Sequence, residues 1–328
     1  MIKIGFTYDL RSAYLAMGYS ELETAEFDRE STIDAIESTL NQLGYETDRI
    51  GHIKQLVERL QNGDRWDIVF NICEGMYGIA REAQVPALLE AYNIPCVFSS
   101  PLVMALTLDK GMTKRVIRDA GIATPEFFVV TKQDDINKVD LPFPLFVKPV
   151  AEGTGKGISE KSIVQNKTEL ASVCRDLLKA YKQPVLVETF LSGREFTVGI
   201  TGTGEKATAV GCMEIVLKEH AEKGVYSYVN KEECEDLIEY VITTGDDKQK
   251  CEKLALEAYR ILNCEDGGRV DIRYSHEGNP SFLEINPLPG LHPEHSDLPI
   301  LCTLNGIAYP ELMKMIMDSA IQKVRQKK

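Results

Sequence analysis

No stretch of this chain approaches the roughly 18 consecutive apolar residues that a membrane-spanning helix requires. The opening residues Met1–Phe6 predict a first β-strand rather than a signal peptide. The chain also lacks the Ser/His/Asp and Cys/His combinations typical of hydrolases, and its first βα unit lacks the glycine fingerprint of dinucleotide-binding proteins. These absences predict a protein without a membrane partner and a chemistry without a side-chain nucleophile.

Closely spaced cysteine pairs are missing as well. The eight cysteines lie at positions 73, 96, 174, 212, 234, 251, 264 and 302, and none forms a Cys-x-x-Cys pair. Most lie in apolar or helical contexts, which predicts reduced, buried thiols in a cytoplasmic protein and no structural zinc. Positive charge is in deficit too, because the net charge is −13. This balance argues against nucleic acid and anionic membranes as partners.

Helices and strands alternate along the 328 residues, which are enough for two or three domains. The first part predicts an α/β sandwich of the Rossmann-like type, with strands at 2–8, 66–73 and 95–98 and helices at 31–44 and 82–92. The middle predicts a separate α+β unit, with helices at 108–120 and 167–181 and strands at 126–130, 145–149 and 185–190. The remainder predicts strands, a helix at 247–262, a hairpin and a helix at 310–324. We place the domains at 1–98, 99–188 and 189–328.

The hairpin near the C-terminus is the most informative segment. Its expected strands, Arg269–Arg273 and Phe282–Asn286, alternate polar and apolar residues with period two. One face then carries Arg269, Asp271, Glu284 and Asn286, and the other directs Val270, Ile272, Leu283 and Ile285 into a core. Three hard oxygen ligands beside an arginine are typical of Mg²⁺ at nucleotide phosphates. The alternative is a solvated face with a surface ion pair.

The turn after the hairpin favours the functional interpretation. Residues Pro287–Leu291 form a rigid segment that contains Gly290 directly after the expected metal ligands. Such a turn suits a backbone amide presented to a substrate oxygen.

Other charged segments suit nucleotide chemistry, although each has a structural alternative. Lys148 ends an apolar strand, where a lysine is costly unless it meets an anion. Residues Glu152–Gly157 form a glycine-rich loop whose amides can bind phosphate, or a mobile turn. Glu188 and Glu195 are candidates for the adenine amino group and the ribose hydroxyls, or are edge-strand acids. Lys110 opens a helix, where a lysine is more often solvated.

Read together, these segments resemble the ATP-grasp superfamily and, within it, the D-alanine–D-alanine ligase family. The resemblance covers nearly the whole chain and implies an ATP-grasp fold with an N-terminal Rossmann-like domain, a central lid domain and a C-terminal catalytic domain. Its anchors, in chain order, are Asp109-Lys110, Val147-Lys148-Pro149, Glu152–Gly157, Val187-Glu188, Gly193–Phe196, Gly268–Asp271, Glu284–Asn286 and Pro289-Gly290.

The resemblance implies ATP and two Mg²⁺ ions as cofactors, with Mn²⁺ as a substitute. The nucleotide would be held by phosphate lysines, the glycine-rich loop, the adenine hinge, the ribose acid and a lysine of a mobile loop. These are Lys110, Lys148, Glu152, Gly153, Thr154, Gly155, Gly157, Glu188, Thr189, Leu191, Glu195 and Lys231. Asp271, Glu284 and Asn286 match the metal ligands, and Arg269 and the Gly290 amide match the groups that stabilise the oxyanion.

The chain departs from the family around the amino-acid substrates. Asp28 matches the glutamate that the family uses at its first substrate. Thr154 and Tyr228 match the serine and the tyrosine that are the partners of that glutamate. Glu74 replaces a histidine near the first substrate, and an acid there disfavours a bound carboxylate. The first pocket should therefore prefer an ammonium or a neutral group at that point.

The second-substrate loop departs too. Ser296 matches the family's carboxylate-binding serine if the loop is one residue longer, and His292 and His295 are candidate substrate contacts or structural histidines.

The chain is identified as an ATP-dependent carboxylate–amine ligase that works through an acylphosphate, with amino-acid substrates that can differ from D-alanine. One alternative is a D-alanine–D-alanine ligase of peptidoglycan synthesis. The other is a nucleotide-binding regulator without turnover. The expected partners are a small-molecule carboxylate and an amine, and assembly as a homodimer stays open.

Overall fold

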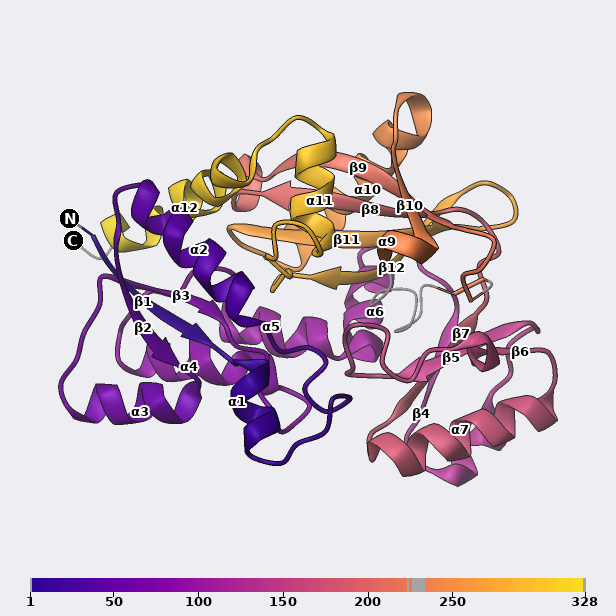
Figure 1. Cartoon of the computed structure of the whole chain (residues 1–328). Helices are drawn as coiled ribbons and strands as arrows, with labels where there is room; N and C mark the ends of the chain where they lie inside the picture. Colours follow the sequence, from indigo (N-terminus) through magenta and orange to yellow (C-terminus); the bar gives the residue numbers. More distant parts are fainter. Residues whose placement is uncertain (1, 223, 226–233, 327–328) are drawn as a thin grey trace.

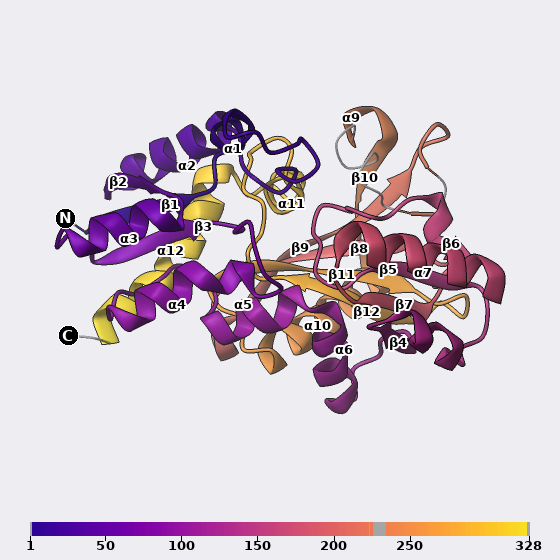
Figure 2. The same ribbon diagram turned by 90° about the horizontal axis from the view of Figure 1, so that it is seen from below.

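The chain builds three separate β-sheets in the computed structural model, which describes residues 2–222, 224–225 and 234–326 (Figure 1). Seen from below in Figure 2, the N-terminal sheet and the four-stranded sheet lie towards opposite ends of the molecule, with the five-stranded sheet between them. Apart from Thr189 at the end of β7, one sheet falls in each of the three predicted residue ranges. The domain boundaries themselves stay a prediction.

The N-terminal sheet is parallel, with strand order β2-β1-β3. All five residues of β3 are buried, as expected of a strand in a sheet covered on both faces. The elements are β1 (Lys3–Tyr8), α1 (Arg11–Ala16), α2 (Glu30–Gln42), β2 (Glu46–Gly51), α3 (Ile53–Gln61), β3 (Ile68–Ile72), η1 (Arg81–Ala83) and α4 (Gln84–Ala91). The α/β prediction is confirmed here. The strand expected at 95–98 is wrong, since this segment forms only an isolated bridge between Cys96 and Val69.

The C-terminal helix α12 (Tyr309–Gln326) returns to this N-terminal unit and packs against α2 (Figure 1). Its buried residues Leu312 and Ile316 share one hydrophobic core with Ile4, Phe6 and Ile33. The two ends of the chain therefore stabilise the same layer.

The four-stranded sheet is antiparallel, with order β4-β7-β5-β6, and α7 packs on it. Asp109 caps the helix expected near 108–120 by accepting a 2.9 Å hydrogen bond from Met112 N. The elements of this part are α5 (Pro101–Leu108), α6 (Lys110–Asp119), β4 (Phe127–Val130), η2 (Gln133–Lys138), β5 (Leu145–Pro149), η3 (Glu160–Ser162), β6 (Ile163–Val164), α7 (Lys167–Tyr181) and β7 (Val185–Thr189). The α+β prediction is confirmed for this unit.

The five-stranded sheet is antiparallel, with order β10-β9-β8-β11-β12. Its elements are β8 (Glu195–Thr201), η4 (Gly204–Lys206), β9 (Thr208–Leu217), α9 (Cys234–Leu237), β10 (Ile238–Ile242), α10 (Gly245–Ile261), β11 (Gly267–Tyr274), β12 (Pro280–Asn286) and α11 (Asp297–Leu304). Val198 and Val270 pack in a core with residues of α10, whereas α11 packs over Gly199 on the opposite face. The face under α11 also carries the polar residues of the hairpin.

A β-bulge corrects one detail of the predicted hairpin. The register of β11 and β12 shifts between Asp271 and Ile272, so that Ile272 pairs with Phe282. Phe282 is therefore fully buried in the core, and Leu283 is only partly buried and lines a cavity instead. The prediction that Leu283 lies in the core is wrong because strict period-two alternation does not survive a bulge.

None of the helices among the described residues is long and apolar enough to cross a membrane. The cysteines at 73, 96, 174, 212, 251, 264 and 302 are free thiols, and all of these except Cys96 are buried.

One buried ion pair joins α12 to the end of the first unit. Asp266 is fully buried, accepts a 2.9 Å hydrogen bond from Phe98 N and lies 2.7 Å from Lys323 Nζ. Lys323 also donates to the carbonyl oxygens of Cys96 and Phe98 at 3.1 and 2.6 Å.

Replacing Lys323 with Met should lower the free energy of unfolding by about 3 kcal/mol, because the buried carboxylate of Asp266 then lacks its cation. Chemical denaturation measures this loss. The matched control is Lys314→Met on the same helix, since Lys314 is 60% exposed in its pair with Asp318 and should change stability by less than about 0.5 kcal/mol. Equal effects of the two changes would contradict the role of this pair.

Candidate active site

The register of the hairpin brings the expected polar residues together. Arg269 pairs with Asn286 and Asp271 pairs with Glu284, so the four side chains lie on one face of two adjacent strands. Arg269 donates to both carboxylate oxygens of Asp271 at 2.6 and 2.5 Å, and it lies 3.5 Å from Asp297. The predicted convergence is confirmed.

Hydrogen bonds fix the orientation of this group. Thr197 on β8 donates to Asp271 Oδ1 at 2.9 Å, and Asn286 Nδ2 donates to Asp271 Oδ2 at 3.3 Å. Burial by itself lowers the pKa of Arg269, but Asp271 and Asp297 outweigh it and hold that pKa above the ordinary arginine value. The arginine is therefore a permanent, fixed cation.

Two lysines, one near the end of β5 and one at the start of α6, lie close to the carboxylate of Glu284. Lys148 at the end of β5 lies 3.4 Å from Glu284 Oε2, and Lys110 at the start of α6 lies 3.8 Å from the same oxygen. Lys110 also donates to the carbonyl oxygen of Glu152 in the glycine-rich loop at 2.7 Å. Burial opposes the charge of Lys148, but Glu188 and Glu284 raise its pKa above the ordinary value. Lys148 therefore stays protonated although it is buried.

The Glu188 carboxylate is held by lysines. It lies 2.8 Å from Lys114 and 3.4 Å from Lys148, and all three side chains are almost fully buried. Burial would raise the pKa of Glu188, but the two lysines outweigh burial and lower it. Lys114 is a residue that the sequence analysis missed, although Lys110 and Lys114 are spaced to share one helix face.

A small cavity of about 70 Å³ lies between the four- and five-stranded sheets. It is lined by most of the predicted nucleotide residues: Lys110, Lys148, Glu152, Gly155, Glu188, Thr189, Leu191 and Glu195. Gly157 is not among the lining residues. It packs on Pro149, where a Cβ atom would approach Pro149 Cγ to 2.6 Å. Arg273, also in the lining, lies 3.3 Å from Glu195.

A larger cavity of about 280 Å³ adjoins it. Residues from the N-terminal unit, the glycine-rich loop and the hairpin line it, including Asp28, Glu74, Gly153, Thr154, Arg269, Glu284, Asn286, Gly290, His295 and Ser296. Lys110 and Glu284 line both cavities. A group in the small cavity and a group in the large one would therefore meet at these two side chains.

The acid that contacts the glycine-rich loop is Glu26. Its carboxylate accepts a 2.5 Å hydrogen bond from Gly153 N and lies 2.8 Å from Arg81 and 3.4 Å from Lys156. Among the described side chains, no hydrogen bond joins Asp28 to Thr154, although both residues line the large cavity. Sequence analysis chose Asp28 although Glu26 lies in the same segment, and only the packing against the loop separates the two.

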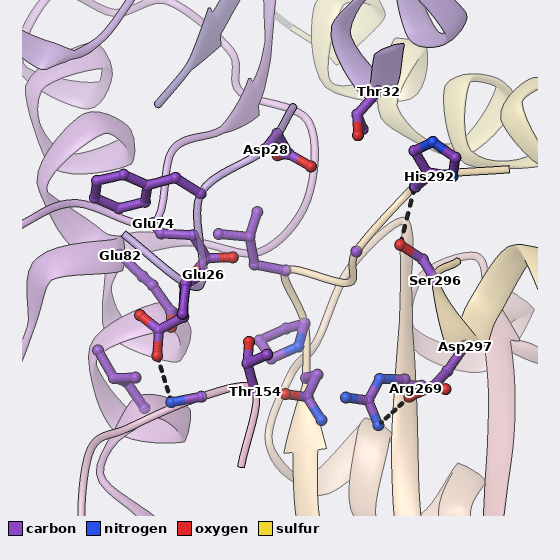
Figure 3. Close-up of a pocket in the computed structure, with 18 of the residues that line it drawn as sticks. Glu26, Asp28, Thr32, Glu74, Glu82, Thr154, Arg269, His292, Ser296 and Asp297 are labelled. Carbon is purple, nitrogen blue, oxygen red and sulfur yellow. Dashed lines mark hydrogen bonds and ion pairs between the residues drawn. The ribbon is translucent and has the colours of Figure 1, made fainter. Parts of the chain in front are cut away.

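Glu74 lies at the large cavity beside an acid that the sequence analysis missed. Figure 3 shows Glu26, Glu74 and Glu82 on one wall, with Arg269, Ser296 and Asp297 on the other. Glu74 and Glu82 both line this cavity and are partly buried. Burial and the neighbouring acids raise the pKa of Glu74 well above its ordinary value and that of Glu82 to about 7. Burial therefore disfavours the charged form of both carboxyl groups.

The turn after the hairpin brings Gly290 and Ser296 together. Ser296 Oγ accepts a hydrogen bond from His292 N at 2.9 Å, and a Cβ atom on Gly290 would approach that Oγ to 2.8 Å. The rings of His292 and His295 lie 4.6 Å apart. Two predicted site residues, Tyr228 and Lys231, lie outside the described residues.

Comparison with known proteins agrees with this geometry. The family model described as "D-ala D-ala ligase C-terminus" matches residues 116–318. The D-alanine–D-alanine ligase of Aquifex aeolicus is 34% identical over 288 residues, which are 86% of this chain and 92% of that protein.

Two solved structures share the fold. The D-alanine–D-alanine ligase from Bacillus anthracis complexed with ATP superposes with a TM-score of 0.75 at 24% identity, and each chain is fully covered. The VanG D-Ala:D-Ser ligase from Enterococcus faecalis gives a TM-score of 0.74 at 20% identity, over 97% of this chain and 99% of that one. The fold is therefore ATP-grasp. On the sequence matches, the chain belongs to the D-alanine–D-alanine ligase family, the ATP-dependent ligases that form carbon–nitrogen bonds.

Proposed function

We propose that this protein activates a carboxylate with ATP and joins it to an amine. The carboxylate attacks the γ-phosphorus of ATP, which gives an acylphosphate and ADP, and the amine then displaces phosphate to form the amide. The observation that carries this proposal is the junction of two cavities at Lys110 and Glu284. A γ-phosphate that projects from the small cavity would there meet a carboxylate held in the large one.

On the nucleotide side, we assign the α- and β-phosphates to Lys110 and Lys148. These cations counter the charge of the phosphates, and phosphoryl transfer needs positioning and charge neutralisation more than covalent help from the protein. The adenine would lie along the backbone of residues 188–191, because the Glu188 carboxylate is already engaged by Lys114 and Lys148. Glu195 is assigned to the ribose.

The hairpin fits Mg²⁺, with Mn²⁺ as a substitute. No group of three His, Cys, Asp or Glu side chains among the described residues is arranged to hold a metal. Asp271, Glu284 and the amide oxygen of Asn286 instead offer a small set of hard ligands, which suits ions that take further ligands from phosphates and water. When bound, two such ions would neutralise the charge of the transferring phosphoryl group.

On the acyl side, we assign Arg269 and the backbone amide of Gly290 to the oxyanion of the tetrahedral intermediate. Arg269 is suited to this role because Asp271 and Asp297 hold its guanidinium in place. The site would close over the acylphosphate and exclude water. We assign this closure to Thr154, to either Asp28 or Glu26, and to Tyr228 and Lys231.

The substrates are amino acids or related carboxylates and amines, with Ser296 and His295 on the acceptor side. The relatives' names favour D-alanine for both positions. The acidic wall with Glu74 favours amino acids other than D-alanine as carboxyl donors. A cytoplasmic location suits an enzyme that consumes ATP and keeps its described cysteines as free thiols.

The direct experiment is ADP release on mixing the protein, ATP and Mg²⁺ with a panel of D- and L-amino acids. A ligase should release ADP only when a donor and an acceptor are present, and mass spectrometry should identify the amide. If D-alanyl-D-alanine is the best product of the whole panel, the substrate is that of the relatives. If no pair releases ADP, the ligase proposal fails.

Glu284→Gln should reduce ADP release by at least about 100-fold, because the amide removes one charged metal ligand and the carboxylate shared by Lys110 and Lys148. A steady-state assay at saturating Mg²⁺ measures the loss. Glu277→Gln, on the exposed tip of the same hairpin, is the matched control and should keep normal turnover. Normal turnover in the Glu284 variant would exclude the metal assignment.

Lys148→Met should weaken ATP binding about 10- to 100-fold, since charge-assisted hydrogen bonds contribute about 1.5–3 kcal/mol. Isothermal titration calorimetry with ATP and Mg²⁺ tests this expectation. Lys161→Met removes an exposed lysine next to β6 in the same sheet and should leave the affinity unchanged. An unaltered affinity in the Lys148 variant would contradict the phosphate assignment.

A further inference from the structure

The large cavity contains more carboxylic acids than lysines and arginines. Its lining includes the acids Glu26, Asp28, Glu74, Glu82, Glu284 and Asp297, the cations Arg11, Arg29, Lys110 and Arg269, and the histidines His292 and His295. An acidic lining is unexpected at a site that must admit a carboxylate. The ion pairs of these side chains show which of the acids have a cationic partner.

Three of the acids already have cations. Glu26 is paired with Arg81 at 2.8 Å, Glu284 with Lys148 at 3.4 Å and Asp297 with Arg269 at 3.5 Å. The other three are Asp28, Glu74 and Glu82, and the ion pairs of the described part of the chain include none of them. The cation Arg11 is itself paired with Glu21 at 2.7 Å.

The three remaining acids all come from the N-terminal unit. Asp28 precedes α2, Glu74 follows β3 and Glu82 lies in η1. In Figure 3 they lie on the far side of the cavity from Arg269 and Asp297. The proposed phosphoryl and acyl transfers use Lys110, Glu284, Arg269 and Gly290, so no step of the reaction requires a carboxyl group at Glu74 or Glu82.

Glu74 and Glu82 lie on the same wall of the large cavity, and both are partly buried (Figure 3). Two neighbouring carboxylates in such a site disfavour each other's ionisation unless a cation lies between them. A substrate ammonium or guanidinium can supply that cation, and each carboxylate then gains a charge-assisted hydrogen bond.

We infer that the carboxyl donor is an amino acid with a second cationic group on its side chain, and that this group binds between Glu74 and Glu82, with Asp28 nearby. The inference rests on the proposed ligase function and names its donor class. The donor's carboxylate lies at the Arg269 end, where phosphate is transferred, and its side chain points to the N-terminal wall. The cationic group is thus bound away from the reacting carbon. It determines which donor is selected and takes no part in the chemical step.

The test compares donors of matched shape. Lysine, ornithine and arginine, each as the D- and L-isomer, are set against norleucine, norvaline and citrulline in the ADP-release assay. We expect at least one cationic donor to have a kcat/KM at least tenfold higher than its neutral counterpart. Equal values within every pair, or a preference for the neutral member, would overturn the inference while leaving the ligase proposal intact. Failure of every donor to release ADP would overturn both.

The variants Glu82→Gln and Glu74→Gln keep the shape of each side chain and remove a charge. In each, the ratio of cationic to neutral kcat/KM should fall at least tenfold, and the fall should appear mainly in KM. Glu90→Gln, on the exposed face of α4, is the matched control and should keep the ratio. ATP affinity and thermal unfolding verify that the variants fold. An unchanged ratio in both folded variants would show that the pair only has a structural role.

Discussion

The carboxylate of Glu284, between Lys110 and Lys148, is the interaction on which the site depends. Each of the three side chains comes from a different element: β12 of the five-stranded sheet, the start of α6 and the end of β5. Bringing these charges out of water is costly, and their mutual attraction offsets that cost only in a fixed geometry. The three charges therefore hold the two larger sheets in one relative position. The same position creates the junction of the two cavities.

The N-terminal unit completes the site with more acids than bases, since it supplies Glu26, Asp28, Glu74 and Glu82 against Arg11 and Arg29. Glu26 connects this unit to the glycine-rich loop through Gly153, and Arg81 and Lys156 neutralise its charge. Asp28, Glu74 and Glu82 face the cavity without such partners in the described ion pairs. The half of the site proposed for phosphoryl transfer thus contains lysines paired with acids, and the amino-acid half carries acids outside the described ion pairs.

Local patterns predicted much of the fold and several of the residues that gather at the small cavity. Period two in Arg269–Arg273 and Phe282–Asn286 placed four polar residues on one face, and the register of β11 and β12 confirms it. The predicted alternation is wrong at one point, because the bulge beside Asp271 places Phe282 in the core instead of Leu283. The segment at 95–98 looked like a strand because it is apolar, but it pairs with β3 through only one bridge.

The sequence by itself determined which chemical groups are available and the secondary structure that carries them, because spacing along a strand or helix depends only on local geometry. The tertiary structure decided which charges meet. Lys114 binds Glu188 across 74 positions of the chain, and Glu26 reaches Gly153 across 127. The neutralisation of buried charges and the pKa shifts follow from such contacts between residues far apart in the chain. The sequence alone therefore does not reveal them.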